Sequence, residues 1–357
     1  MLLSKISQHD KFYLYGAQVV AYGAYRAIKY LIGKRPVAFL VGSISGNPSQ
    51  IDGIAVTTCE KVDKQALIIV AVTELLQGEI VSALRRDGFD NLFLLTAQEE
   101  HRLMTAYFAR HDLFPVVDTA VKKESGVAKV STATPDFVLY EVCNYRDKPV
   151  TSPPNLHPFE IRIQAGAALT KERIASLTDD TGQNISDRNK QYCEMSAVYW
   201  IWKNRRHDWV GIEHYRRHLL VTPDMLSDEV DAILPLPYMC YSNTLAQFRR
   251  FVGEDVVTAL LKALQELHPS EYPRYLAVLE DEYQYTYNLL CSRWSVFDDY
   301  CAWFFHITEY MESMADEVAD INNTRALSYV AEVLTNLYFR ANSRSLRLRH
   351  VEKGVYV

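Results

Sequence analysis

The chain has 357 residues, of which 48% are hydrophobic and 23% are charged. This length suggests two domains, since a domain usually has about 100–200 residues, and the composition is that of a globular protein. The net charge of −6 argues against a nucleic-acid-binding protein, which would need a broad basic surface. The sequence has no apolar run of the ~20 residues that a membrane-spanning helix requires.

The N-terminal segment and the cysteines indicate the compartment and the redox state of the protein. The N-terminal segment MLLSKISQHDKF lacks the apolar core of a secretory signal, so we expect a cytoplasmic protein. The six cysteines are scattered and form no CxxC pair. This favours reduced thiols over a disulfide or metal framework.

The first part of the chain alternates strands with helices. Apolar runs predict strands at residues 12–16, 35–43, 66–72 and 91–96. Helical spacing predicts helices at residues 19–32, 73–88 and 98–111, and residues 51–62 are expected to be a short connection. The alternation predicts βαβ units and hence a small Rossmann-like parallel-sheet domain over residues 1–120.

The turn after the first predicted strand decides whether this domain binds a dinucleotide. A dinucleotide fingerprint needs glycines for a tight turn and for close approach to the diphosphate. Gly16 and Ala21 suit the first and third positions, but Gln18 occupies the second. A glutamine side chain would crowd a diphosphate, so we expect an accessory domain that does not bind NAD.

The second part of the chain begins after a stretch rich in Lys, Ser and Thr, which we interpret as a linker over residues 121–135. A second domain is expected over residues 136–357. Strands are predicted at residues 137–143 and 209–212, with a loop at residues 145–160. Helices are predicted at residues 244–253, 255–267, 271–286, 296–316 and 325–341, and residues 345–357 alternate like an edge strand.

Residues 179–217 concentrate polar and aromatic side chains beyond what a core needs. The strand predicted at residues 209–212 leads directly into Glu213, His214, Tyr215, Arg216 and Arg217. Open α/β sheets bind ligands at the carboxyl ends of their strands, and paired guanidinium groups suit a diphosphate. The alternative is an exposed cluster of ion pairs.

The loop that precedes this strand carries a second group of polar residues, Asp179, Asp180, Asn184 and Asn189. Such residues either bind a donor sugar or ribose, or cap the helix that follows. Both interpretations stay open from sequence.

Two helices carry further candidates. Glu194 and Trp202 lie near one face of a predicted helix, where the tryptophan is either a sugar platform or a core residue. Glu332 lies on the apolar helix YVAEVLTNLYF, where a carboxylate is costly. It is therefore the best candidate base, although a buried salt bridge to Arg325 or Arg216 would also explain it.

The motifs NISDRNKQYCEMSAVYWIWKN and WVGIEHYRRHL resemble the HYRR-type capsular-polysaccharide glycosyltransferases, a family long catalogued as a domain of unknown function. The resemblance extends over roughly residues 136–350. The family's opening strand usually ends in His-Lys, whereas this chain has Cys143 and Asn144 near that place.

This resemblance implies a GT-A-like α/β domain with a helical C-terminal half. It also implies transfer from a nucleotide sugar, expected to be a uridine diphosphate (UDP) sugar, to a growing surface or capsular polysaccharide that can be lipid-linked. The residues above then divide into three groups: catalytic Glu332, Glu213 and His214; donor-binding Asp179, Asp180, Asn184, Asn189, Glu194, Tyr215, Arg216 and Arg217; and acceptor-binding Trp202 and Asn288. The alternative is a non-catalytic nucleotide- or glycan-binding protein that regulates polysaccharide assembly.

Metal dependence is predicted from the HYRR region, and membrane contact from the C-terminal segment. Only Glu213 stands where metal-dependent relatives of this fold carry an Asp-x-Asp motif. Arginines can take over the electrostatic task of the cation, so we expect partial dependence on Mn²⁺ or Mg²⁺. The basic residues near the C-terminus predict at most weak contact with the inner face of the cytoplasmic membrane.

Overall fold

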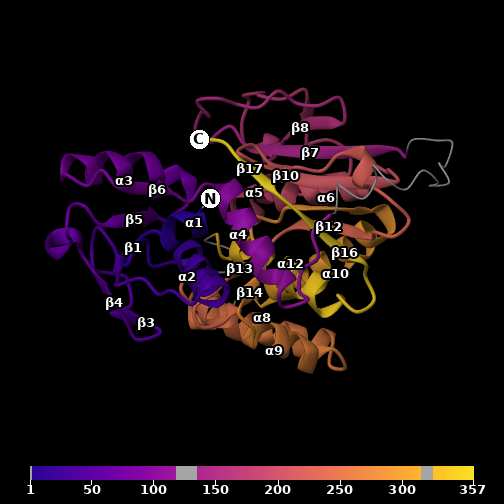
Figure 1. Ribbon diagram of the computed structural model, residues 1–357. Coiled ribbons are helices and arrows are strands. Elements are labelled where there is room, and N and C mark those ends of the chain that lie inside the picture. The colour runs from indigo at the N-terminus through magenta and orange to yellow at the C-terminus, as the bar shows by residue number, and fades with distance from the viewer. Residues whose placement is uncertain (1, 118–134, 315–324) are drawn as a thin grey trace, which may run out of the picture. The chain divides into compact units, whose positions relative to one another are not determined.

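A computed structural model describes residues 2–117, 135–314 and 325–357 (Figure 1). The chain divides into two compact units. Unit 1 comprises residues 1–115 with 238–241 and 357, and unit 2 comprises residues 116–237 and 242–356. All of the predicted linker except Pro135 lies outside the described residues.

Unit 1 is a six-stranded sheet in the order β3-β4-β2-β1-β5-β6. Neighbouring strands are parallel, except that β3 and β4 are antiparallel. The strands are β1 (Phe12–Tyr15), β2 (Phe39–Leu40), β3 (Gln50–Ile51), β4 (Ile54–Thr57), β5 (Leu67–Val70) and β6 (Leu92–Leu94). The helices are α1 (Leu2–Ser7), α2 (Val19–Ile32), α3 (Glu74–Arg86) and α4 (Ala97–Ala109).

Helices cover both faces of this sheet, as predicted for a parallel α/β sheet. On one face, Val81 and Leu84 of α3 pack against Ile68 and Val70 of β5. On the other, α2 packs against α4, and the ring of Tyr25 meets Phe39 edge-on. The apolar run of β5 is therefore buried on both sides. The prediction of a connection at residues 51–62 was wrong, because this segment contains β4.

The turn between β1 and α2 is tight. Gly16 has φ 127°, and a Cβ atom there would lie 2.4 Å from the carbonyl oxygen of Ala71, so only glycine fits. Gln18 stands at the start of α2, where its side-chain amide donates to Asn47 Oδ1 at 3.2 Å.

Unit 2 contains a nine-stranded mixed sheet, whose main path runs β16-β12-β15-β10-β7-β8-β9. The central strands β10, β7, β8 and β9 are parallel, whereas β15 is antiparallel to β10 and β12. The strands are β7 (Phe137–Cys143), β8 (Glu160–Gln164), β9 (Leu177–Thr178), β10 (Trp209–His214), β11 (Arg217–Leu219), β12 (Ala232–Pro235), β15 (Leu290–Arg293), β16 (Leu348–Val351) and β17 (Lys353–Val355). A further short strand of unit 2 is β14 (Tyr283–Gln284), and β13 (Tyr238–Met239) lies in the segment assigned to unit 1.

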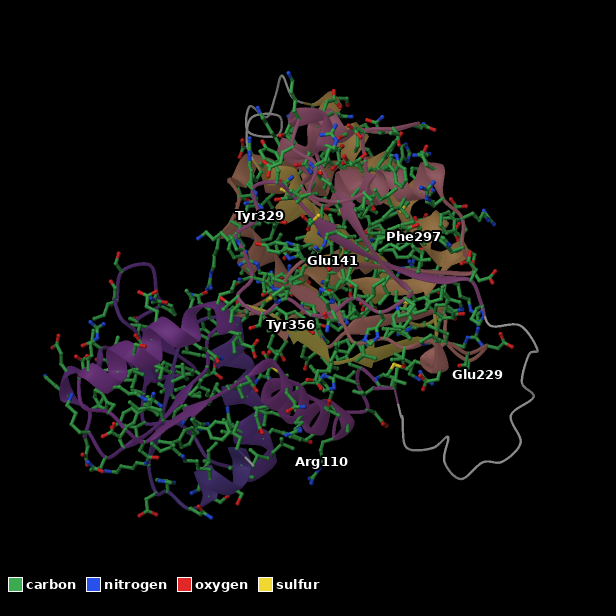
Figure 2. The ribbon with its side chains drawn as sticks, turned by 90° about the horizontal axis from the view of Figure 1, so that it is seen from above. Arg110, Glu141, Glu229, Phe297, Tyr329 and Tyr356 are labelled. Carbon is green, nitrogen blue, oxygen red and sulfur yellow. The ribbon has the colours of Figure 1, made fainter. Side chains whose placement is uncertain are left out.

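The helical layer of unit 2 lies against this sheet. Its helices are α5 (Asn189–Tyr192), α6 (Met195–Asn204), α7 (Thr244–Arg249), α8 (Glu254–Leu267), α9 (Tyr272–Glu280), α10 (Trp294–Ser313) and α12 (Ala326–Ala341). Helix α10 contacts β10 and β15, and its Phe297 is fully buried inside unit 2 (Figure 2). The predicted helical C-terminal half is confirmed, although the helix expected at residues 271–286 ends at Glu280.

Alternation along β10 assigns its side chains to two different environments. Consecutive strand residues point to opposite faces of a sheet. Trp209 belongs to an apolar cluster with Phe137 and Leu139, so Glu213 shares that face. His214 points to the other face.

The fold as a whole is mixed α/β, with a small parallel-sheet unit followed by a GT-A-like unit. Among the described residues, the helices are too short or too polar to cross a bilayer.

Candidate functional site

A pocket of about 730 Å³ opens in unit 2 where the parallel strands β7 and β10 end. The carboxyl ends of parallel strands are the usual ligand site of open α/β sheets. The lining residues come from β7 and the loop after it, from the segment that enters α6, from the end of β10 and from the start of α12. They are Val142, Cys143, Asn144, Arg146, Asp147, Ala165, Asn189, Lys190, Gln191, Cys193, Glu194, His214 and Arg325.

The HYRR motif forms a tight hairpin at the end of β10. His214 pairs with Arg217 across antiparallel strands, which leaves Tyr215 and Arg216 as the two turn residues. The turn is anchored by the C-terminal segment, because the amide of Tyr356 donates to the carbonyl of Arg216 at 2.9 Å. The hairpin therefore holds two guanidinium groups beside the pocket.

The two arginines have different neighbours. The guanidinium of Arg217 lies 4.0 Å from the ring centroid of Tyr287, and that of Arg216 lies 4.5 Å from the ring of Tyr215. Burial and the charge of Arg217 lower the pKa of Arg216, whereas Asp147 raises it. Both groups keep their charge, because an arginine remains protonated at physiological pH.

His214 lines the pocket as a neutral ring. Burial, and then the charges of Arg217 and Arg216, lower the pKa of His214 to about 3. Its Nδ1 atom has no hydrogen-bond partner among the described residues. His214 therefore offers a ligand a hydrogen bond rather than a positive charge.

Asp147 is a pocket residue that sequence reasoning missed. Its carboxylate accepts the amide of Asn144 at 2.7 Å, and burial raises the pKa of Asp147 to about 6. The signal was available, since residues 144–147 directly follow the strand at 137–143.

Glu194 stands at the start of α6 and lines the same pocket. Its Oε1 accepts the Asn288 amide at 2.8 Å, while Thr335 donates to Asn288 Oδ1 at 2.8 Å. Burial raises the pKa of Glu194, and the hydrogen bond from Asn288 and the charges of Arg325 and Arg217 oppose that rise. Asn288 thus orients Glu194.

Glu332 is a second acid in this region, and the charge of Glu194 acts on it. Burial, and next the charge of Glu194, raise the pKa of Glu332 to about 7. A backbone hydrogen bond from Tyr287 and the charge of Arg217 hold it lower than burial alone would. A carboxylate whose pKa lies near the working pH can accept and release a proton there.

The backbone around these two acids is strained. Cys193, Tyr287 and Asn288 have φ angles of 49°, 68° and 52°, values that favour glycine. Such conformations cost about 1–3 kcal/mol each and tend to gather at functional sites. Here they occur beside Glu194, at Asn288, which donates to Glu194, and at Tyr287, whose amide donates to Glu332.

Asp179 and Asn189 hold the pocket wall together. Both oxygens of the buried Asp179 carboxylate are occupied, by the amides of Gly166 and Ala167 and by the hydroxyls of Ser186 and Ser196. Asn189 does line the pocket, and its Oδ1 accepts the Asn144 amide at 3.1 Å. The contacts of Asp179 are structural, and its amide donors belong to the loop after β8.

Of the thirteen predicted site residues, Asn189, Glu194 and His214 line the pocket and the other ten do not. Four of those ten make contacts of a structural kind. Asp180 pairs with Arg173 at 2.8 Å, and Asn184 accepts the Ser186 amide. Trp202 donates to Asp298 and stacks on Phe305, so it packs α6 against α10. Glu213 faces the opposite side of the sheet, where burial and the charge of Glu160 raise its pKa to about 9.

Comparison with known proteins gives two positive findings. A family model described as a domain of unknown function, DUF4422, matches residues 146–343. Among solved structures, the chain is similar to the apo structure of the bifunctional glycosyltransferase WbbM, with a TM-score of 0.53 and 22% sequence identity. The similarity covers 62% of this chain and 45% of that one. No curated protein matches.

These findings differ in what they establish. At 22% identity, the likeness to WbbM shows a shared fold, and the chain spans less than half of that protein. The family model covers more than half of the chain and includes the HYRR hairpin and the helices that carry Glu194 and Glu332. The chain therefore belongs to the family described as the domain of unknown function DUF4422.

Proposed function

We propose that the protein is a glycosyltransferase that moves a sugar from a nucleotide sugar, a UDP sugar, to a growing surface or capsular polysaccharide. The observation that carries the proposal is the arrangement at the pocket. Glu194 and Arg325 line the pocket. The charges of Arg325 and Arg217 act on Glu194, and the charges of Glu194 and Arg217 act on Glu332. The fold shared with a glycosyltransferase supports it.

The donor diphosphate is assigned to the arginine side of the pocket. Arg325 lines the pocket, and Arg216 and Arg217 lie on the adjacent hairpin. Fixed guanidinium groups stabilise the negative charge that develops on a departing diphosphate. His214 adds a neutral hydrogen-bonding group, and Asp147 and Asn144 shape the floor.

Glu332 is assigned as the base that activates the acceptor hydroxyl. The hydroxyl oxygen forms a bond to the anomeric carbon of the donor sugar, and its proton passes to the Glu332 carboxylate. The bond from the anomeric carbon to the diphosphate oxygen breaks, and the diphosphate leaves with the electron pair. Glu194 raises the proton affinity of Glu332 through its charge.

Partial dependence on Mn²⁺ or Mg²⁺ remains part of the proposal. The arginines supply the positive charge at the diphosphate, so a cation would add to their effect rather than provide all of it. Asp179 is excluded as a ligand by its four hydrogen bonds.

Binding of UDP tests the donor assignment directly. Titration calorimetry should show UDP binding that weakens at least tenfold in Arg216→Ala, because a charge-assisted contact is lost. Arg344→Ala is the matched control, since Arg344 is exposed. Equal UDP affinity in the Arg216→Ala and Arg344→Ala proteins would contradict the assignment.

A further inference from the structure

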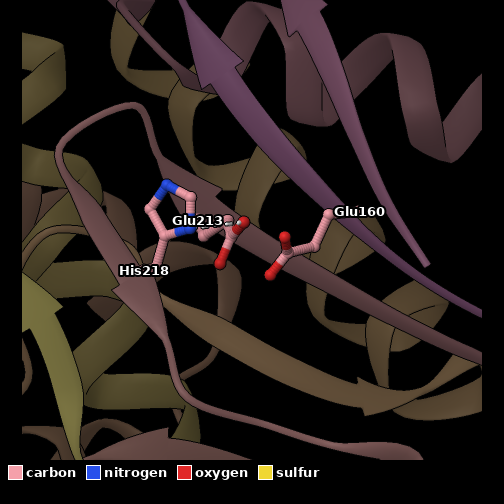
Figure 3. Close-up of side chains that lie close together, drawn as sticks. All are labelled: Glu160, Glu213 and His218. Carbon is pink, nitrogen blue, oxygen red and sulfur yellow. Dashed lines mark ion pairs between the residues drawn. The ribbon is translucent and has the colours of Figure 1, made fainter. Parts of the chain in front are cut away.

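A second polar cluster lies on the face of the unit 2 sheet opposite the pocket. It consists of Glu160 at the start of β8, Glu213 near the end of β10 and His218 in β11 (Figure 3). One ligand atom from each of these residues lies within 4.8 Å of the others. Figure 3 shows the three side chains converging from separate strands.

Two atoms of this cluster are buried without a hydrogen-bond partner. Glu213 is 1% exposed and His218 is 3% exposed. Glu213 Oε1 and His218 Nε2 make no hydrogen bond to the described residues, and Glu213 Oε1 lies 3.4 Å from His218 Nδ1. Buried polar atoms nearly always have a hydrogen-bond partner. His218 Nε2 faces Glu141 Oε2 at 3.5 Å, whereas Glu213 Oε1 faces the cluster itself, and this unsatisfied oxygen indicates a ligand.

The remaining oxygens of the cluster are fixed by the protein. The amide of Leu219 donates to Glu213 Oε2 at 3.1 Å, and the amide of His157 donates to Glu160 Oε2 at 2.6 Å. The carboxylates are therefore held in orientation, as ligands of a metal usually are.

The surroundings are rich in carboxylates. Arg162 is bound through two hydrogen bonds to Glu141, at 2.7 and 3.1 Å. Glu141 lies opposite Glu213 in the β7–β10 register, and its Oε2 atom lies 3.5 Å from His218 Nε2. Glu141 thus adds a further carboxylate beside Glu160 and Glu213, and oxygen donors gathered in this way suit a divalent cation.

We propose that Glu160, Glu213 and His218 bind a first-row transition-metal dication, Mn²⁺ or Zn²⁺. Mixed oxygen and imidazole donors suit these ions, whereas Mg²⁺ and Ca²⁺ prefer oxygen ligands alone. Bond lengths of about 2.0–2.2 Å require only small movements of atoms that already lie this close.

The site would fix the HYRR hairpin rather than contact the donor. Its ligands come from β8, β10 and β11, so a bound ion ties together the two strands of the hairpin and their neighbour. The ring of Tyr356 closes over His218, with centroids 5.1 Å apart. The cluster and the pocket lie on opposite faces of the sheet, so the metal site can be tested whether or not the protein transfers a sugar.

Metal binding to chelator-treated full-length protein tests the site without any activity assay. Electron paramagnetic resonance for Mn²⁺ and calorimetry for Zn²⁺ should each show one equivalent bound, with a raised Tm. Mg²⁺ at the same concentration should not displace the ion. Glu160→Gln, the least buried ligand, should lower affinity at least tenfold, and so should His218→Gln.

The matched control is Glu280→Gln, an exposed glutamate of α9, which should leave affinity unchanged. Should His218→Gln fail to fold, Glu160→Gln alone decides. Absence of bound Mn²⁺ and Zn²⁺ in the wild-type protein would overturn the proposal, and so would equal affinity in Glu160→Gln and wild type.

Discussion

At the scale of single residues, the protonation state of Glu332 governs the proposed transfer. Its pKa is raised to about 7 by burial and by Glu194. A base must be deprotonated, so activity should fall as pH drops below about 7. Glu332→Gln should lower turnover by roughly 10²–10⁴-fold, the usual range for loss of a general base, while UDP still binds.

The pH–rate profile and the Glu332→Gln rate are both measured by steady-state kinetics. Glu229→Gln is the control, because Glu229 lies exposed at the edge of unit 2 (Figure 2). Glu332 is not the base if the activity of the wild-type protein falls only well below pH 6. It is also not the base if the Glu332→Gln protein turns over at a rate close to that of the wild type.

Glu332 should also affect stability. Its folded pKa of about 7 exceeds the ordinary value of 4.5, so the folded state binds the proton more tightly than the unfolded chain does. Its contribution to the free energy of unfolding is full below about pH 4.5 and is lost as pH rises to about 7. Urea denaturation at pH 5 and pH 8 should show a smaller decrease for Glu332→Gln than for wild type. If the decrease is the same in both proteins, the Glu332 carboxylate is not desolvated in the folded state.

At the scale of elements, the loop after β8 is held in shape by one glycine. Gly166 has φ 68°, and a Cβ atom there would lie 2.6 Å from the side chain of Asn189. Gly166→Ala should therefore lower the free energy of unfolding by about 1–3 kcal/mol. Gly33→Ala is the comparison, because Gly33 has φ 70° with no atom within 4 Å.

Denaturant unfolding of both variants separates backbone strain from the collision with Asn189. The Gly166→Ala protein should lose more stability than the Gly33→Ala protein. If both lose the same amount, Asn189 yields without cost, and the pocket wall is less rigid than its hydrogen bonds suggest.

The elements that sequence predicted well are those with an unbroken pattern. The apolar run of β7 and the periodic α2, α8 and α12 were predicted close to their observed bounds. Strand β8 was missed because Glu160 and Arg162 interrupt its apolar run. In the structure these two residues have buried partners, since Arg162 pairs with Glu141 and Glu160 joins the cluster of Glu213 and His218. Tertiary pairing thus stabilises a strand that propensity does not favour.

At the scale of the whole molecule, the pocket could be predicted only in part. The strand-end rule indicated the HYRR hairpin, whose His214 lines the pocket. Side chains alternate between the two faces of a strand, and this rule, applied to residues 209–214, would have placed Glu213 and His214 on opposite faces of the sheet. The convergence of segments near residues 144, 190 and 325 depends on topology, which a single sequence does not fix.

Unit 1 should not bind a dinucleotide tightly. The order of the strands along the sheet reverses at β1, and folds of this type bind ligands at such a position. Gln18, however, takes the place where a glycine would admit a diphosphate. Titration calorimetry with NAD should show no micromolar affinity, and micromolar binding would contradict this expectation.

Association with membranes should be weak and salt-sensitive. Two basic groups near the C-terminus are already engaged: Arg347 pairs with Asp231 at 2.7 Å, and His350 is buried against Tyr285. The charges that remain contribute roughly 1 kcal/mol each at an anionic surface. Co-sedimentation with anionic vesicles should be slight in low salt and absent in high salt, and binding that persists in high salt would reveal an apolar contact.

The most direct test of the central claim is consumption of a nucleotide-sugar donor by the purified protein. A panel of nucleotide sugars is incubated with the protein, and the released nucleoside diphosphate is counted per mole of protein. The proposed function predicts release of UDP far beyond one equivalent from one donor, reduced in Glu332→Gln but not in Glu229→Gln. Donor binding with release of one equivalent or less would contradict it and identify a non-catalytic nucleotide-binding protein.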